Sequence, residues 1–198
     1  MSDLVVGSTL KEFFRLLLED AISRQKVTLA EVTEHYLVNL LAEFAAAEKL
    51  FSEEYGGRKD HEPLAILYHR ALQADRAQKI LTLRRLGDVS LYKAGFFSDS
   101  LRDSVVGPDY YIEMGGAAYA QVASLSAQSG FATAFHELHE KFRALVEVLE
   151  EISARGLAAS GPAGQMRVFE SWVRSGNGRL EKVLVDAGML GPKGLLPN

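Results

Sequence analysis

The two histidines of the segment FHELHEKF are candidates for metal chemistry in this sequence. His136 and His139 are three positions apart, so a helix would turn both imidazole rings toward one side. A metal site would need further ligands, and the sequence has neither an HExxH motif nor the Glu-x-x-His motif of di-iron bundles. We therefore predict no metal site and keep both histidines only as weak candidates, with partly buried or interfacial side chains.

Motifs for covalent chemistry and for phosphate binding are also missing. The chain has no cysteine, which excludes disulfides, iron–sulfur clusters, thiolate zinc sites and a cysteine nucleophile. No serine lies in a G-x-S-x-G segment. The segment GGAAYAQ lacks the Lys-Ser/Thr ending of a phosphate-binding loop. We predict no catalytic residue and no cofactor, and we favour a protein that is not an enzyme.

Residues 86–119 hold the densest run of aromatic, glycine and turn-forming residues in the chain. Adjacent residues of a helix point about 100° apart, so the doublets Phe96-Phe97 and Tyr110-Tyr111 cannot all face one core. Their unburied members would lie beside basic side chains, a combination that is enriched in interaction hot spots. We predict that this surface binds a partner protein or a second copy of the chain. The predicted contact residues are Arg84, Arg85, Tyr92, Lys93, Phe96, Phe97, Arg102, Tyr110 and Tyr111.

An alternative use of the same stretch is a ligand pocket inside the protein. Gly115 and Gly116 fall within an expected helix, where two glycines cost about 2 kcal/mol relative to alanines. Such a cost indicates a kink, a tight helix crossing or the close approach of a ligand. The pocket would be bordered by Tyr92, Tyr111, Gly115, Gly116 and His139, with the tyrosines and the histidine supplying polar groups.

Helical periodicity predicts the elements that position these residues. Apolar residues recur at helical spacing in 10–23, 29–51, 63–86, 109–128 and 131–156. We expect the first helix to start near Ser8 or Thr9, Gly87 to end the third, and Asp88 to cap the next. The chain is therefore predicted to be all-α, a single domain over 1–198. It would form an antiparallel bundle of about seven or eight helices over about 8–156, followed by a short helical pair over about 163–188.

Composition and charge narrow the classes of partner. With 198 residues, 47% of them hydrophobic and 24% charged, the chain can bury a substantial core. Its formal net charge is −4, although residues 61–102 carry seven basic and four acidic side chains. A nucleic-acid-binding protein would need a stronger basic bias, so we expect no nucleic-acid partner. Neither a signal peptide nor a membrane span is recognisable, so we expect a cytoplasmic protein with no membrane partner.

Three segments together resemble a group of bacterial helical proteins to which no function is attached. These segments are EHYLVNLLAEF at 34–44, LGDVSLYKAGFF at 86–97 and DYYIEMGGAAY at 109–119. The resemblance covers most of the N-terminal two thirds of the chain. It implies a bacterial cytoplasmic protein and brings no catalytic or ligand-binding residues.

The segment 109–128 is also similar to the glycine-kinked distal helix of haem oxygenases, in which glycine lets the backbone approach the haem. In that family a histidine near the end of the first helix ligates the iron. The helix expected at 10–23 has no histidine, and the earliest one in the chain is His35.

Our leading hypothesis is a non-enzymatic protein-binding or regulatory module. The alternative is a small-molecule pocket within the bundle. This alternative includes a pocket for a haem-like ligand and a pocket with enzymatic activity.

Overall fold

The computed structural model describes residues 2–55, 63–102, 104–127 and 130–191. Within these ranges the chain is all-α, as predicted, and has no strand. It forms ten helices in the described part, against the seven or eight expected. They are α1 (Ser2–Gln25), α2 (Glu31–Tyr55), α3 (Leu64–Gln73), α4 (Arg76–Phe96), α5 (Ser98–Arg102), α6 (Pro108–Leu125), α7 (Ala132–Glu140), α8 (Phe142–Ala159), α9 (Pro162–Ser175) and α10 (Gly178–Asp186).

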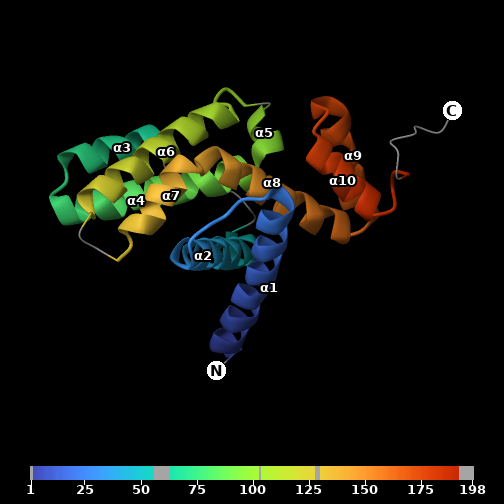
Figure 1. Ribbon diagram of the computed structural model, residues 1–198, viewed down its shortest axis with the longest axis horizontal. Helices are drawn as coiled ribbons and strands as arrows, with labels where there is room; N and C mark the ends of the chain where they lie inside the picture. The colour runs from blue at the N-terminus through green and yellow to red at the C-terminus, as the bar shows by residue number, and fades with distance from the viewer. Residues whose placement is uncertain (1, 56–62, 103, 128–129, 192–198) are drawn as a thin grey trace.

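Helices α4, α6 and α8 form the centre of the molecule (Figure 1). The most extensive packing is between α4 and α6, and α8 packs against α4. The hairpin of α1 and α2 lies across one side of this body, where α1 contacts α8 and α2 contacts α7. Helices α9 and α10 pack against each other and against α8, at the end of the molecule opposite α3.

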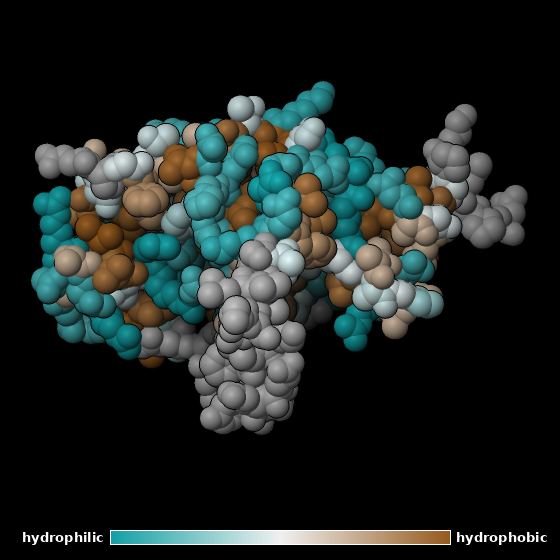
Figure 2. All heavy atoms as spheres, turned by 90° about the horizontal axis from the view of Figure 1, so that it is seen from below, coloured by the Kyte–Doolittle hydropathy of each residue, from teal (hydrophilic) through white to brown (hydrophobic). Residues whose placement is uncertain are grey.

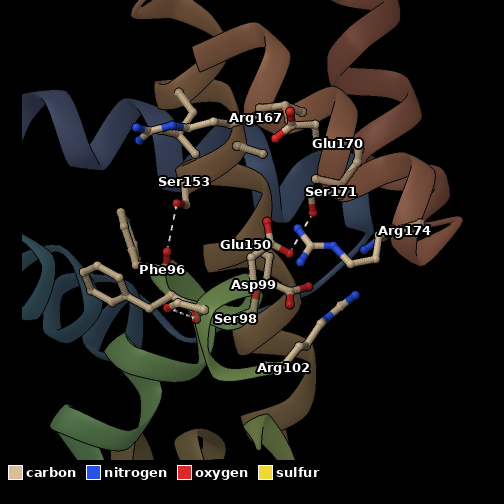
Figure 3. A pocket seen from close by; sticks show the side chains of 18 residues that line it. Phe96, Ser98, Asp99, Arg102, Glu150, Ser153, Arg167, Glu170, Ser171 and Arg174 are labelled. Atoms are coloured by element: carbon tan, nitrogen blue, oxygen red, sulfur yellow. Dashed lines mark hydrogen bonds between the residues drawn. The ribbon is translucent and has the colours of Figure 1, made fainter. Parts of the chain in front are cut away.

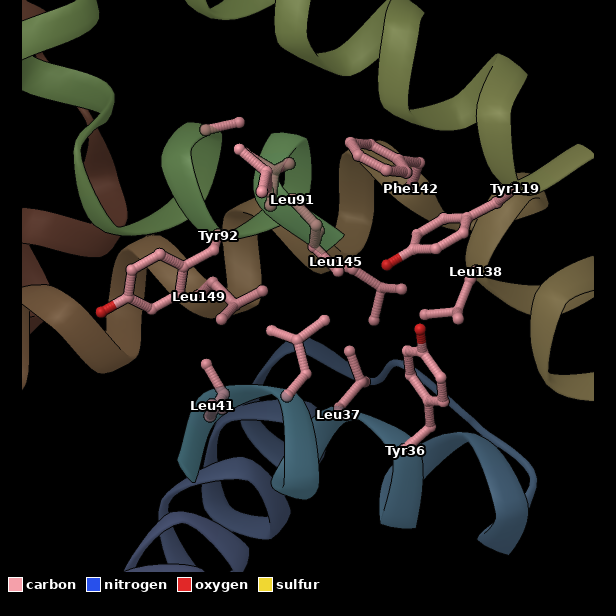
Figure 4. Close-up of a cluster of buried hydrophobic side chains, with 14 of the residues drawn as sticks. Tyr36, Leu37, Leu41, Leu91, Tyr92, Tyr119, Leu138, Phe142, Leu145 and Leu149 are labelled. Atoms are coloured by element: carbon pink, nitrogen blue, oxygen red, sulfur yellow. The ribbon is translucent and has the colours of Figure 1, made fainter. Parts of the chain in front are cut away.

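Two separate apolar clusters lie beneath these helices. The main cluster contains residues of α1, α2, α3, α4, α6, α7 and α8. It includes the fully buried Leu41, Leu86 and Leu145. Figure 4 shows part of this cluster. A smaller cluster joins the end of α8 to α9 and α10. Its buried members are Ala154, Ala158, Val168, Leu180, Val183 and Leu184. The C-terminal helical pair therefore has a small core of its own.

The helix predicted over 63–86 is divided, and this corrects the prediction. Helix α3 ends at Gln73, and Asp75 begins α4 because its carboxylate accepts a hydrogen bond from the Gln78 backbone N–H at 2.9 Å. Helix α4 then continues to Phe96, so Gly87 is not a helix stop and Asp88 is not a cap. A Cβ atom at Gly87 would lie 2.5 Å from the Tyr119 ring, so glycine at this position permits the close crossing of α4 and α6.

Two further boundaries differ from the prediction. Helix α1 begins at Ser2 rather than near Ser8 or Thr9. The stretch expected as one helix over 131–156 is divided at Lys141 into α7 and α8. Apolar spacing continues across this junction, so periodicity alone could not reveal it.

Candidate functional site

Eight of the nine residues predicted to bind a partner lie in three different areas of the surface, and the ninth, Tyr92, lies in the core. Arg84 and Arg85 form the first, on the side of α4 that faces α2. The guanidinium group of Arg84 lies 5.1 Å from the centre of the Tyr36 ring, and that of Arg85 lies 4.8 Å from the centre of the Phe44 ring. Both arginine side chains remain about half exposed. Cation–π contacts therefore hold these two groups against α2.

Lys93, Tyr110 and Tyr111 form the second area, where α4 meets the start of α6. Lys93 Nζ lies 5.7 Å from the centre of the Tyr111 ring, and the two tyrosine rings meet edge to face with 5.6 Å between centres. Burial lowers the pKa of Lys93 and raises the pKa of Tyr111. All three residues are half-buried, so this area offers less free surface than predicted.

Tyr92 is a predicted contact residue that belongs to the core instead. It is only 4% exposed, and its ring is stacked between the rings of Phe44 and Phe96, with centres 4.4 and 4.8 Å away. Phe97 is 41% exposed, and its ring meets the edge of Tyr92 at 5.8 Å. The aromatic row therefore buries Tyr92 and leaves Phe97 accessible.

The space predicted for a ligand at Gly115 is filled by the protein's own side chains. A Cβ atom at Gly115 would lie 2.4 Å from Phe142 Cζ and 2.6 Å from Ser90 Cβ, well inside the contact distance of two carbon atoms. This glycine lets α6 cross α4 and α8 closely. This observation concerns Gly115 alone, and the pocket predicted between Tyr92, Tyr111, Gly115, Gly116 and His139, haem-like or otherwise, stays a prediction.

The two histidines lie on the exposed side of α7, because Phe135 and Leu138 occupy its buried side. Both side chains are exposed, but His139 is interfacial as expected, because it meets a backbone group of α6. His139 Nδ1 lies 2.9 Å from the carbonyl oxygen of Gly116, and His136 pairs with a glutamate one turn later. Among the described residues, no three potential metal ligands come together.

The carboxylate of Asp88 is a buried polar group in the middle of α4, and sequence reasoning misplaced it as a cap. It is 9% exposed and accepts hydrogen bonds from the hydroxyls of Tyr36 on α2 and of Tyr119 on α6, the latter at 2.8 Å. Figure 4 shows the two hydroxyls pointing toward each other. Arg84 Nε donates a hydrogen bond to the Tyr36 hydroxyl at 3.0 Å.

Burial raises the pKa of the Asp88 carboxyl to about 6, although the two tyrosine hydroxyls and Arg84 oppose this rise. Burial, with the neighbouring carboxylate, also raises the pKa of both tyrosines well above the ordinary value. The group links three helices through one carboxylate. We assign it a structural role.

A groove follows α8, with α5 and the start of α6 on one side and α9 and α10 on the other. It consists of two cavities of about 320 and 370 Å³. Both have Arg102, Glu150 and Asn177 in their walls, so they lie end to end along α8. We call the two cavities together the α8 groove. Its charged and aromatic lining residues are Phe96, Phe97, Asp99, Arg102, Asp109, Arg143, Glu147, Glu150, Arg167, Glu170, Arg174 and Arg179.

Hydrogen bonds between helices fix the walls of the first cavity (Figure 3). Ser171 Oγ on α9 donates to an Asp99 carboxylate oxygen on α5 at 2.7 Å. Ser153 Oγ on α8 donates to the backbone carbonyl of Phe96 at 3.3 Å. The groove is therefore built where α9 is held against the end of α4 and α5. Three of the nine predicted residues, Phe96, Phe97 and Arg102, lie in its wall.

The groove contains five arginines and five acidic residues. Arg143 pairs with Asp109 at 3.1 Å, and Arg179 donates to the Glu147 carboxylate. Burial raises the pKa of Glu150, and this rise is opposed by the Ser98 hydroxyl and by the charge of Arg102. The groove therefore has a mixed and internally paired lining, typical of a recognition surface rather than of a charge-uniform channel.

Sequence reasoning missed several groove residues because they lie in ordinary amphipathic helices. Glu150, Arg167, Arg174 and Asn177 show no motif. One weak signal existed: Arg167 and Arg174 are seven positions apart and so lie on the same face of α9. Only the packing of α9 beside α5 brings that face to Arg102.

Exposed apolar side chains outside the groove are spread over several helices. Examples are Phe13 on α1, Leu72 on α3 and Leu81 on α4, each more than half exposed. Figure 2 shows apolar residues in several separate areas among polar ones on one face of the molecule. The concave α8 groove is therefore a better-defined candidate site than any of these convex positions.

Comparison with known proteins gives no indication of the function of this groove. No protein family, curated protein or solved structure matches the chain. In the described ranges every helix is too short or too polar to cross a membrane.

Proposed function

We propose that the protein is a non-enzymatic binding module of the bacterial cytoplasm, and that a segment of a partner protein docks in the α8 groove. The observation that carries this proposal is the end-to-end arrangement of the two cavities along α8. Phe97 supplies an accessible aromatic ring in the wall, and Arg102 stands where the cavities meet. Aromatic and arginine side chains in a concave setting are typical of interaction hot spots.

The length of the groove favours a chain segment over a compact small molecule. Its floor on α8 extends from Arg143 to Leu157, which corresponds to roughly 21 Å at 1.5 Å per residue. An extended segment of about six residues has that length. A small ligand would occupy only one of the two cavities.

The charge of the lining argues against a nucleic-acid partner. Five acidic residues balance the five arginines, whereas phosphate backbones are bound by surfaces with a clear excess of positive charge. The partner is therefore a protein, either another chain or a second copy of this one.

Photo-crosslinking in cells tests the docking site. A photoreactive phenylalanine analogue is placed at Phe97, in the groove, or at Phe131, which is 57% exposed and lies outside the groove. We expect a defined crosslinked product from position 97 only, with the partner segment identified by mass spectrometry. Adding Arg102→Ala to the position-97 variant should reduce the yield several-fold, because the central guanidinium is lost.

The matched control is Lys11→Ala, which removes one exposed positive charge from α1 and should leave the yield unchanged. Equal products from positions 97 and 131 would contradict docking in the groove. The same conclusion would follow if position 97 gave no product. Light scattering of the purified protein separates a second copy from a different partner.

A further inference from the structure

The pairing of charges within the α8 groove indicates the chemistry of the segment that docks there. Four of the five acidic lining residues have a partner on the protein. Asp99 accepts from Ser171, Asp109 from Arg143 and Glu147 from Arg179, while Glu150 has Ser98 and Arg102 beside it. Each of these four carboxylates therefore already has a hydrogen-bond donor or a positive charge of the protein beside it.

The arginines are less completely used. Arg143 and Arg179 are paired with carboxylates, and Arg174 has a contact of its own. Arg102 and Arg167 have no hydrogen bond or ion pair within the part of the chain that the structure describes. Both are exposed and line the first cavity. Each guanidinium has five N–H donors in a planar fork that fits a carboxylate.

Apolar wall lies close to these free donors. Phe97 is 41% exposed and Leu157 is 36% exposed, and both line the same cavity as Arg102 and Arg167. The first cavity therefore presents an apolar contact and unused guanidinium N–H donors together. Glu170, one turn from Arg167 on α9, is the one acidic lining residue without such a partner in the described chain. The five acidic residues balance the charge of the five arginines, so what the cavity offers a ligand is the unused guanidinium N–H donors of Arg102 and Arg167.

We propose that the groove selects an acidic segment, in which an Asp or Glu side chain lies next to an aromatic or large aliphatic one. The carboxylate binds Arg102 or Arg167 through charge-assisted hydrogen bonds, and the apolar side chain packs on Phe97 and Leu157. This inference rests on the proposed function. It adds the chemistry of the partner to the place where the partner binds.

Selection from a random dodecapeptide library displayed on phage tests the inference with the full-length protein as bait. Peptides enriched on the wild-type protein should carry Asp or Glu beside an aromatic residue or Leu. On the double variant Arg102→Glu, Arg167→Glu the preference should shift to Lys and Arg. Lys11→Glu, an equal charge change on an exposed residue of α1, should retain the acidic preference.

A synthetic copy of the most enriched peptide extends the test to affinity. Its Kd should rise tenfold or more with Arg102→Gln, a milder change that guards against misfolding of the double variant, and should also rise with added salt. One outcome would overturn this inference and leave the proposed function standing: the enriched peptides show no preference for Asp or Glu, and their enrichment is lost on the Phe97→Ala variant. Enrichment that neither Phe97→Ala nor the double variant alters would overturn both.

Discussion

At the scale of single residues, Asp88 shows how a buried charge can organise a helical core. Its carboxylate accepts hydrogen bonds from tyrosines on two other helices, and Arg84 extends the chain of donors to the surface. A buried carboxylate is costly when ionised, unless its hydrogen bonds are complete. The position of Asp88 between two tyrosine hydroxyls reduces that cost without removing it, since the pKa stays raised at about 6.

The raised pKa of Asp88 predicts a pH dependence of stability. The pKa is about 6 in the folded protein against an ordinary value of 3.8, so the folded state holds this proton more tightly than the unfolded chain does. The protonated Asp88 carboxyl therefore stabilises the folded state fully below about pH 4, and this stabilisation is lost as the pH rises through 6. The difference of about two pKa units corresponds to about 3 kcal/mol.

Asp88→Asn isolates this contribution, because asparagine keeps a carbonyl acceptor for the tyrosines and does not titrate. Urea unfolding of both proteins between pH 4 and pH 7 gives the free energy of unfolding of the wild type relative to the variant. That difference should fall by about 3 kcal/mol as the pH rises. A difference that stays constant, or that grows with pH, would show that the pKa of Asp88 is not raised in the folded protein.

At the scale of helices, adjacent glycines of α6 have different tasks. A Cβ atom at Gly115 would meet Phe142 and Ser90 at 2.4 and 2.6 Å, whereas one at Gly116 would find its nearest atoms at 3.9 Å. Phe142 is only 3% exposed, so its ring has no free space into which to move. Of these two adjacent glycines, only Gly115 is therefore needed for the close crossing of α6 with α4 and α8.

A matched pair of substitutions tests this difference. Gly115→Ala should lower the free energy of unfolding by about 1–2 kcal/mol, because overpacking outweighs the gain in helix propensity. Gly116→Ala, one position away, should raise it by up to about 1 kcal/mol, since only the propensity changes. Thermal or urea unfolding of the two variants gives both signs. Equal effects would mean that the crossing tolerates a methyl group at Gly115.

Periodicity along the chain was sufficient to predict helices and most of the core. It could not predict that Gly87 and Asp88 lie inside α4, because the reasons are contacts with Tyr119 and Tyr36 from distant helices. The cap at Asp75 is local, a hydrogen bond from the Gln78 backbone N–H, but apolar spacing carries no sign of it. A glycine needed for a helix crossing has the same sequence signature as one that ends a helix.

The candidate site was predictable only in part, for the same reason. Phe97 and Arg102 stood out because aromatic and basic residues are concentrated around them in the sequence. Arg167, Glu150 and Asn177 belong to helices far along the chain, and only tertiary packing gathers them into one groove. The sequence indicated which side chains could bind a partner near Phe97 and Arg102. It did not indicate which distant residues would form the walls of a concave site with them.

At the scale of the whole molecule, the α8 groove depends on how firmly α9 and α10 are held to the main body. The pair has its own small core, and ion pairs join it to other helices. Asp186 at the end of α10 accepts from Arg24 of α1 at 3.3 Å and from Arg155 of α8 at 3.0 Å. Because Asp186 is about half exposed, these pairs contribute about 1 kcal/mol at most.

Asp186→Ala should therefore loosen the C-terminal pair without unfolding the body. Hydrogen exchange of amides in α9 and α10 should become roughly fivefold faster, the factor that about 1 kcal/mol produces, while amides of α4 and α6 stay as protected as in the wild type. Arg15→Ala, which removes exposed ion pairs within α1, is the matched control and should leave α9 and α10 unchanged. Acceleration spread evenly over all helices would instead mean that the two cores unfold as one unit, so that the outer wall of the groove is as rigid as the body.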